Sequence, residues 1–159
     1  MTGGQNSLDS ARESDWEQLV ALLASSGLPT AGLEEHLPTT LVVREGDRIL
    51  GSVAIEMYGS DALLRSLAVS AECRGRGLGR RLAVSALDLA GSRGAARVYL
   101  LTETAASFFR RIGFRDVPRS DVPERLQRSL EFASLCPSTA EVLTLSLSER
   151  SPARETDQM

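Results

Sequence analysis

Apolar side chains recur along the chain at two spacings, one typical of strands and the other of helices. Alternating or β-branched runs bounded by turn residues predict strands, and apolar residues three and four apart predict amphipathic helices. Strands are predicted at Leu8–Ala11, Thr40–Arg44, Ile49–Met57, Ala62–Val69, Arg97–Thr102 and Ala140–Leu147. Helices are predicted from a capping box at Ser14–Glu17 to Gly27, at Leu78–Ala90, at Thr104–Arg111 and at Pro123–Phe132, with one helical turn at Leu33–Leu37.

The order of these elements predicts a mixed sheet. The turn Glu45–Asp47 joins two β-rich runs as an antiparallel hairpin. Strand, helix and strand between Ala62 and Thr102 predict a right-handed crossover between parallel neighbours, with a ligand site at their carboxyl ends. Because no repeat or linker interrupts the order, we expect an α/β (α+β) fold with one domain over residues 1–148 and a polar tail over 149–159.

Composition narrows the functional classes. The net charge of −3 and the isoelectric point near 5.3 do not support general binding to nucleic acid or to an acidic membrane. No apolar run approaches the roughly 18 residues of a membrane span, and no signal-peptide pattern is evident, so we expect a cytoplasmic protein. Cys73 and Cys136 are expected to be reduced thiols, and no residue pattern predicts a metal site.

A glycine-rich basic turn opens the helix predicted at Leu78–Ala90. The run Arg74-Gly-Arg-Gly-Leu-Gly-Arg-Arg81 has three glycines, four arginines and no carboxylate. Glycines let the backbone approach an anion, and a helix N-terminus presents unpaired N–H groups. The phosphate loop of nucleoside triphosphatases needs a lysine, which the chain lacks, and the dinucleotide fingerprint needs glycine where Arg80 stands. The turn therefore predicts another kind of pyrophosphate site.

Two segments resemble motifs of the GCN5-related N-acetyltransferase (GNAT) family. Arg74-Gly-Arg-Gly-Leu-Gly79 resembles its R/Q-x-x-G-x-G/A loop, and Thr102-Glu-Thr-Ala-Ala-Ser-Phe-Phe-Arg-Arg-Ile-Gly-Phe114 resembles its N-x-x-A-x-x-F-Y-x-x-x-G-F segment. The resemblance implies the GNAT fold, in which helices flank a mixed sheet of about six or seven strands. It also implies acetyl-coenzyme A as the cofactor.

Finer likenesses point to two branches of the family. The segment from Leu101 to Phe114, followed by Val122–Arg125, is similar to the acetyltransferase domain of N-acetylglutamate synthases. Leu64–Val69 together with Glu131–Ser138 is similar to stand-alone acetyltransferases encoded in arsenic-resistance operons. The second likeness implies a substrate related to amino-acid-like arsenical or phosphinic toxins.

The family resemblance implies which residues contact acetyl-coenzyme A. The backbone of Leu67, Ala68 and Val69 would pair with the pantetheine arm and polarise the thioester carbonyl, although a core strand would have the same sequence. The other implied cofactor residues are Arg74, Gly75, Arg76, Gly77, Leu78, Gly79, Arg80, Thr102, Phe109 and Arg111. A charged outer helix face explains Arg111 equally well.

Acetyl transfer requires a neutral amine, so a base or a water path must remove a proton. Glu56 is the first candidate base, because it ends the alternating run of the hairpin, where the family places substrate-facing carboxylates. A solvated charge at the end of a strand is the alternative. Glu72 and Glu103 are weaker candidates, each explained as well by a surface charge.

The general acid of the family is missing from its usual place. Phe109 stands where a tyrosine is usual, and it cannot donate a proton. Tyr58, Ser107 or water would replace the acid, or the thiol, with a pKa near 8.5, would leave as a thiolate. His36, in an entry loop, is more simply structural or solvated than a substrate contact.

Arg65 and the adjacent Ser66 are the candidates for binding an acid group of the acceptor. A guanidinium binds a carboxylate through two parallel hydrogen bonds. Strict alternation sets Arg65 on the same face as Leu67 and Val69, near the reacting centre. An exposed strand arginine is an equal alternative.

Cys136 and Ser138 are further candidate substrate residues. They occupy the region where N-acetylglutamate synthases present an arginine and a serine to the distal carboxylate of their substrate. No arginine of this chain matches that pair, which puts glutamate in doubt as the acceptor.

With the resemblance, these residues predict an acetyl-coenzyme A-dependent N-acetyltransferase. The amine of a small amino-acid-like molecule would attack the thioester directly, in a role that the second likeness connects with arsenic or toxin resistance. A degenerate domain that senses coenzyme A or an amino acid is the alternative, because of Phe109. The expected partner is the small amine, with neither nucleic acid nor membrane, and a homodimer is compatible with the sequence.

Overall fold

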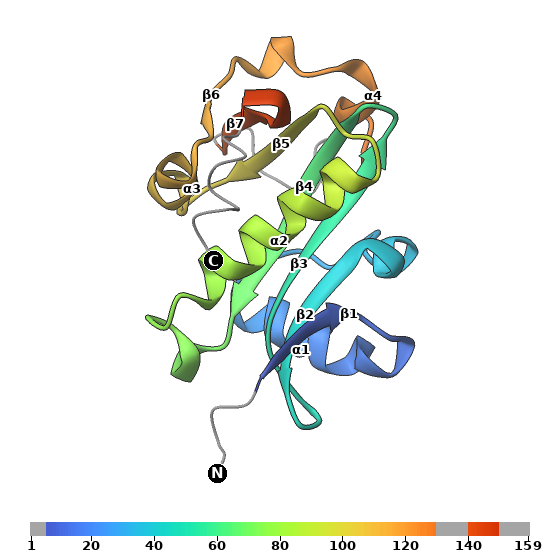
Figure 1. Ribbon diagram of the computed structural model, residues 1–159, viewed down its shortest axis with the longest axis vertical. Helices are drawn as coiled ribbons and strands as arrows, with labels where there is room; N and C mark the ends of the chain where they lie inside the picture. Colours follow the sequence, from blue (N-terminus) through green and yellow to red (C-terminus); the bar gives the residue numbers. More distant parts are fainter. Residues whose placement is uncertain (1–5, 130–139, 150–159) are drawn as a thin grey trace.

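The computed structural model describes residues 6–129 and 140–149, which form a mixed β-sheet flanked by helices (Figure 1). The seven strands of this sheet lie in the order β1-β2-β3-β4-β5-β7-β6. They span Ser7–Ser10 (β1), Thr40–Glu45 (β2), Arg48–Tyr58 (β3), Asp61–Val69 (β4), Arg97–Thr102 (β5), Arg115–Asp116 (β6) and Glu141–Ser146 (β7). The α-helices of this part are Trp16–Ser25 (α1), Leu78–Ser92 (α2), Ala106–Ile112 (α3) and Glu124–Gln127 (α4). The predicted fold class is confirmed.

β4 and β5 are parallel neighbours, and α2 connects them. Their pairing begins where Asp61 lies opposite Arg97 and ends where Leu63 lies opposite Tyr99. Beyond that point β4 stays paired with β3, and β5 stays paired with β7. The predicted parallel neighbours, joined through a helix, are confirmed. The early end of the pairing leaves the carboxyl-terminal halves of β4 and β5 without hydrogen bonds to each other.

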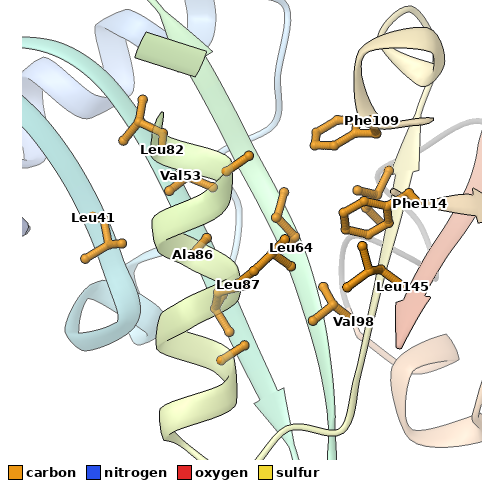
Figure 2. Close-up of a cluster of buried hydrophobic side chains, with 14 of the residues drawn as sticks. Leu41, Val53, Leu64, Leu82, Ala86, Leu87, Val98, Phe109, Phe114 and Leu145 are labelled. Carbon is orange, nitrogen blue, oxygen red and sulfur yellow. The ribbon is translucent and has the colours of Figure 1, made fainter. Parts of the chain in front are cut away.

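The larger hydrophobic core lies between α2, α3 and one face of the sheet (Figure 2). Its labelled members are Leu41, Val53, Leu64, Leu82, Ala86, Leu87, Val98, Phe109, Phe114 and Leu145. The rings of Phe109 and Phe114 meet edge to face with centroids 5.6 Å apart. Each large side chain buried here stabilises the fold by about 1.5–3 kcal/mol. This core fixes the N-terminal ends of α2 and α3 beside the diverging strands.

The opposite face of the sheet is covered by α1, the segment 33–37 and α4. Leu19 and Leu23 of α1 pack with Leu33 against Val42 and Ala54 of the sheet. α4 covers the region of β4 and β5 through a separate cluster around Leu63, Tyr99 and Leu126. α4 is shorter than the predicted helix at Pro123–Phe132, of which residues 130–132 lie outside the described residues.

A β-bulge interrupts β4 at Ser66. Val53 of β3 lies opposite both Ser66 and Leu67, and Ser66 adopts a φ of 63°, in the left-handed region. The hydroxyl of Ser52 donates to the Ser66 carbonyl oxygen at 2.9 Å and supports this geometry. Because the extra residue shifts the alternation, Leu67 packs toward α2 while Arg65 points to the opposite face. The prediction that these two residues share a face was therefore wrong.

The start of α1 also differs from the prediction. The capping box predicted at Ser14–Glu17 does not form. Instead, Asp15 ends a 3₁₀ turn, and its carboxylate accepts a hydrogen bond from the backbone N–H of Arg12 at 2.8 Å. Arg44 of β2 donates two parallel hydrogen bonds to Asp15, at 2.8 and 2.9 Å, and both side chains are buried. These bonds hold the pKa of Asp15 below its ordinary value, against the opposing effect of burial. The pair ties α1 to the sheet.

Arg44→Leu is expected to lower the free energy of unfolding by about 3–5 kcal/mol, because it leaves the buried Asp15 carboxylate without its counter-charge. Urea unfolding at pH 7 measures the loss. Arg48→Leu is the control, because the pair of Arg48 with Glu72 is exposed and contributes at most about 1 kcal/mol. Equal losses for the two variants would contradict the prediction.

The same pair predicts the sign of a pH effect. With a lowered pKa in the fold, Asp15 contributes its stability above the unfolded pKa near 3.9 and loses it as the pH falls through the folded value. The stability difference between wild type and Asp15→Asn should therefore shrink on acidification below about pH 4. A difference that grows there would refute this assignment.

Candidate functional site

A cleft of about 560 Å³ opens where β4 and β5 diverge. Its lining comprises the loop Ser26–Pro29, the strand segments Leu64–Val69 and Leu100–Thr102, the turn Glu103–Ala105, and Arg74, Gly79, Phe108, Phe109 and Ala140. Beyond Leu63 the edge of β4 that faces this cleft has no partner strand. An extended ligand with amide groups could therefore hydrogen-bond to β4 as a neighbouring strand would.

The glycine–arginine turn lies at the cleft and begins α2. Gly75 and Gly77 have φ values of 84° and 80°, which favour glycine, and Gly77 is the N-cap of α2. A β-carbon on either glycine would have no heavy atom within 4 Å, so the turn presents open backbone. Arg74 lines the cleft and donates from Nε to the Val69 carbonyl at 3.0 Å. The turn can hold an anion against the N-terminus of a 15-residue helix.

The other residues predicted for this turn differ in their surroundings. Arg76 and Arg80 are exposed and do not line the cleft. Leu78 is a buried core residue, so only its backbone is available to an anion. Gly79 lines the cleft, and a β-carbon there would lie 3.5 Å from the Phe108 ring. Phe108 packs partly buried against the core and also forms part of the cleft.

The β5 bank of the cleft ends in a tight turn before α3. Thr102 accepts the backbone N–H of Ala105 at 2.9 Å and lines the cleft. Phe109 lines the cleft and is buried against Phe108, with ring centroids 5.1 Å apart. Arg111 is exposed and is not part of the cleft lining. The structure therefore brings Thr102 and Phe109 to the cleft but leaves Arg111 outside it.

Arg65 forms a buried ion pair on the β4 bank. Its Nη1 donates to Glu56 Oε2 at 2.8 Å, its Nε donates to Ser66 Oγ at 3.1 Å, and its Nη2 donates to the Pro29 carbonyl at 3.2 Å. The Arg65 side chain has no exposed area, and that of Glu56 is 3% exposed. Arg65 is thus held in the cleft wall with its charge balanced by Glu56.

A second cavity of about 380 Å³ lies behind this wall. Its lining residues are Gly32, Glu35, His36, Glu56, Tyr58, Arg125, Arg128 and Ser129. Tyr58 donates its hydroxyl to Glu56, and burial together with this bond raises the pKa of the phenol. His36 Nε2 lies 3.7 Å from Glu56 Oε2. Glu56 faces this second cavity and is absent from the cleft lining, whereas Arg65 lines the cleft.

The structure separates the three carboxylates considered as bases. Glu56 lies in the second cavity, and Glu72 pairs with Arg48 outside the cleft. Glu103 is exposed and lines the cleft. Ser107, named as a substitute acid, is exposed and does not line the cleft.

One bank of the cleft was not predicted from the sequence, and two predicted substrate residues lie outside the described residues. The loop Ser26–Pro29 forms one bank, although its only sequence signal is a glycine and a proline after a helix. Cys136 and Ser138 fall outside the described residues. In the described segments no helix is long and apolar enough to cross a membrane.

Residues 37–116 match the model of a known family, described as an acetyltransferase (GNAT) domain. The chain belongs to the GNAT family. The matched segment contains the glycine–arginine turn, β4, β5 and α3, which together surround the cleft. The family assignment made from the two sequence motifs is confirmed.

One curated GNAT relative is an uncharacterised N-acetyltransferase of Chlorobaculum tepidum, 32% identical over 95 residues. The alignment covers 59% of this chain and 61% of the relative. The chain thus spans less than two thirds of the length of that protein.

Solved structures share the GNAT fold. N-acetylglutamate synthase from Neisseria gonorrhoeae, crystallised with coenzyme A and N-acetyl-glutamate, superposes with a TM-score of 0.78 at 21% identity, over 90% of this chain and 35% of that one. Rv2747 from Mycobacterium tuberculosis, crystallised with coenzyme A, superposes with a TM-score of 0.75 at 21% identity. The superposition covers 88% of this chain and 98% of Rv2747. At this identity the likeness establishes the fold.

Glu56→Gln is expected to lower the free energy of unfolding by about 3–5 kcal/mol, because the buried Arg65 guanidinium loses its counter-charge. Adding Arg65→Met to Glu56→Gln should recover part of that loss, because Arg65→Met removes the uncompensated positive charge. Urea unfolding of wild type, both single variants and the double variant measures the coupling. Strictly additive losses would show that the two side chains do not stabilise each other.

Proposed function

We propose that the protein is an acetyl-coenzyme A-dependent N-acetyltransferase that acts on the amine of a small amino-acid-like molecule. The observation that carries the proposal is the cleft between β4 and β5, which extends from the glycine–arginine turn to the bulge at Ser66. Membership of the GNAT family supports it, as do the coenzyme A complexes of proteins with this fold.

The residues of the cleft fit a nucleotide thioester. The backbone N–H groups from Gly75 to Gly79, with Arg74, Arg76 and Arg80, would hold a pyrophosphate. The unpaired edge of β4 at Leu67–Val69 would pair with the amide groups of a pantetheine arm. When bound, acetyl-coenzyme A supplies an acyl group activated as a thioester.

The acceptor amine would attack this thioester directly. Its nitrogen forms a bond to the carbonyl carbon, the bond from that carbon to sulfur breaks, and one proton leaves the nitrogen. The predicted catalytic role of Glu56 and Tyr58 requires the acceptor or a water to reach the second cavity, because Arg65 stands between Glu56 and the cleft. Arg65 and Ser66 would form the wall against which the acceptor lies.

The wider setting is proposed on the sequence resemblance alone. An amino-acid-like arsenical or phosphinic acceptor would fit the likeness of Leu64–Val69, together with Glu131–Ser138, to enzymes of arsenic-resistance operons. The cytoplasmic location and the homodimer remain predictions from the sequence.

Phe109 supports the alternative that the domain senses coenzyme A without turnover. It lines the cleft at the position of the usual general acid. In that alternative the cleft would bind the cofactor, and binding rather than acetyl transfer would be the function.

Calorimetric titration with acetyl-coenzyme A should show stoichiometric binding that Gly77→Glu abolishes, because the new carboxylate enters the anion site. Gly46→Glu is a matched control: Gly46 also has a positive φ, of 62°, with open space around it, but it lies in the turn between β2 and β3. Both variants therefore place a side chain on left-handed backbone and add the same charge. Absence of binding to wild type at high micromolar concentration, or equal loss in both variants, would refute the assigned site.

Free-thiol release with a panel of α-amino acids, aminophosphinic acids and alkyl amines should exceed the hydrolysis background for at least one amine. The reason is that a thiol with a pKa near 8.5 can leave as a thiolate without the tyrosine that Phe109 replaces. Stoichiometric binding in calorimetry without turnover of any amine in the panel would favour the sensor.

A further inference from the structure

We propose that Glu103 binds the ammonium group of the acceptor and accepts its proton. This inference rests on the proposed acetyltransferase function. Glu103 follows β5 directly and lines the cleft. It is the sole acidic residue in the lining that the structure describes, where Arg65 and Arg74 are the basic ones.

The register of the sheet places Glu103 opposite the bulge. Leu63 pairs with Tyr99, and three residues further along each strand lead to Ser66 and Thr102. Along the strand direction, Glu103 therefore lies about level with the bulge, on the opposite bank of the cleft. This is the level along β4 at which its unpaired backbone would contact the acyl end of a thioester.

The charges in the cleft favour Glu103 over the other carboxylates. Glu56 already balances Arg65 and faces the second cavity. Within residues 6–129 and 140–149, Glu103 makes neither a hydrogen bond nor an ion pair, and it is exposed. A cationic amine in this cleft therefore finds one carboxylate whose charge is not already balanced by a protein cation.

The backbone that carries Glu103 is held in place. The hydroxyl of Thr102 accepts the N–H of Ala105 and closes the turn around residue 103. Ala106, the first residue of α3, is buried in the core that also contains Phe109. The turn is thus fixed at both ends, while the Glu103 side chain is solvent-accessible and can exchange protons with water.

In the proposed reaction, Glu103 carries protons from the acceptor nitrogen. The ammonium gives one proton to the Glu103 carboxylate, and the neutral nitrogen attacks the thioester carbonyl carbon. The new carbon–nitrogen bond forms as the carbon–sulfur bond breaks, and the electron pair of that bond leaves on sulfur as a thiolate. Glu103 passes this first proton to water before the attack, and as the amide forms it accepts the second proton that the nitrogen loses. It then gives that second proton to the thiolate, which restores the carboxylate and yields the free thiol.

Glu103→Gln is the test, read out as the pH dependence of kcat/KM with the most active amine of the panel above. At pH 7 the variant should be slower than wild type by about 10²–10⁴-fold. Its rate should approach that of wild type as the pH rises past the pKa of the free amine, near 8 for an α-amino group. Acetyl-coenzyme A binding measured by calorimetry should be unchanged.

Glu17→Gln on the exposed face of α1 is the matched control and should leave activity unchanged. Turnover by wild type together with a Glu103→Gln variant that is equally active, or that is slowed by the same factor at every pH, would overturn the inference. If wild type turns over no amine, the proposed function fails instead. Unchanged urea unfolding of the variant excludes a folding defect.

Discussion

The structure depends on the divergence of two parallel strands. β4 and β5 stop pairing after Leu63 and Tyr99, and each keeps its outer partner, β3 or β7. Unpaired strand backbone is costly when it is buried away from water. It is stable here because the two strand edges border a cleft, while α2 and α3 pack firmly on the same face. The fold therefore offers a row of backbone groups to any ligand that can pair with them.

The charged side chains follow from the same architecture. Burial of a charge is tolerated when a partner balances it. Arg44 meets Asp15, and Arg65 meets Glu56, so each buried arginine on the α1 side of the sheet has its carboxylate. Exposed charges need no such partner, because water solvates them, and Glu103 at the cleft is one of these. Among the described residues, two charges of the cleft lining thus have no ion-pair partner, Glu103 on the β5 bank and Arg74 of the glycine–arginine turn.

The sequence predicted the parts of this architecture that local patterns determine. The strand and helix spacings gave the mixed sheet and the crossover, and three glycines among arginines gave the turn before α2. The bulge was not predictable, because Ser66 adopts a φ of 63° that serine does not signal, and so the face of Arg65 was wrong. The bond between Asp15 and Arg44 spans 29 residues, beyond the reach of a local capping pattern. Long-range contacts likewise decide that Glu56 faces away from the cleft.

Phe109 gives the inferred role of Glu103 a second consequence. An apolar wall of phenylalanines packed edge to face disfavours a thiolate next to it, because low polarity penalises the charged form. The N-terminus of α2 and its arginines act in the opposite sense and stabilise negative charge nearby. With no tyrosine at residue 109, another proton source beside the reacting atoms becomes more valuable. A carboxylate that has just taken the proton of the amine is such a source, so one exposed residue would serve both as base and as acid within a single turnover.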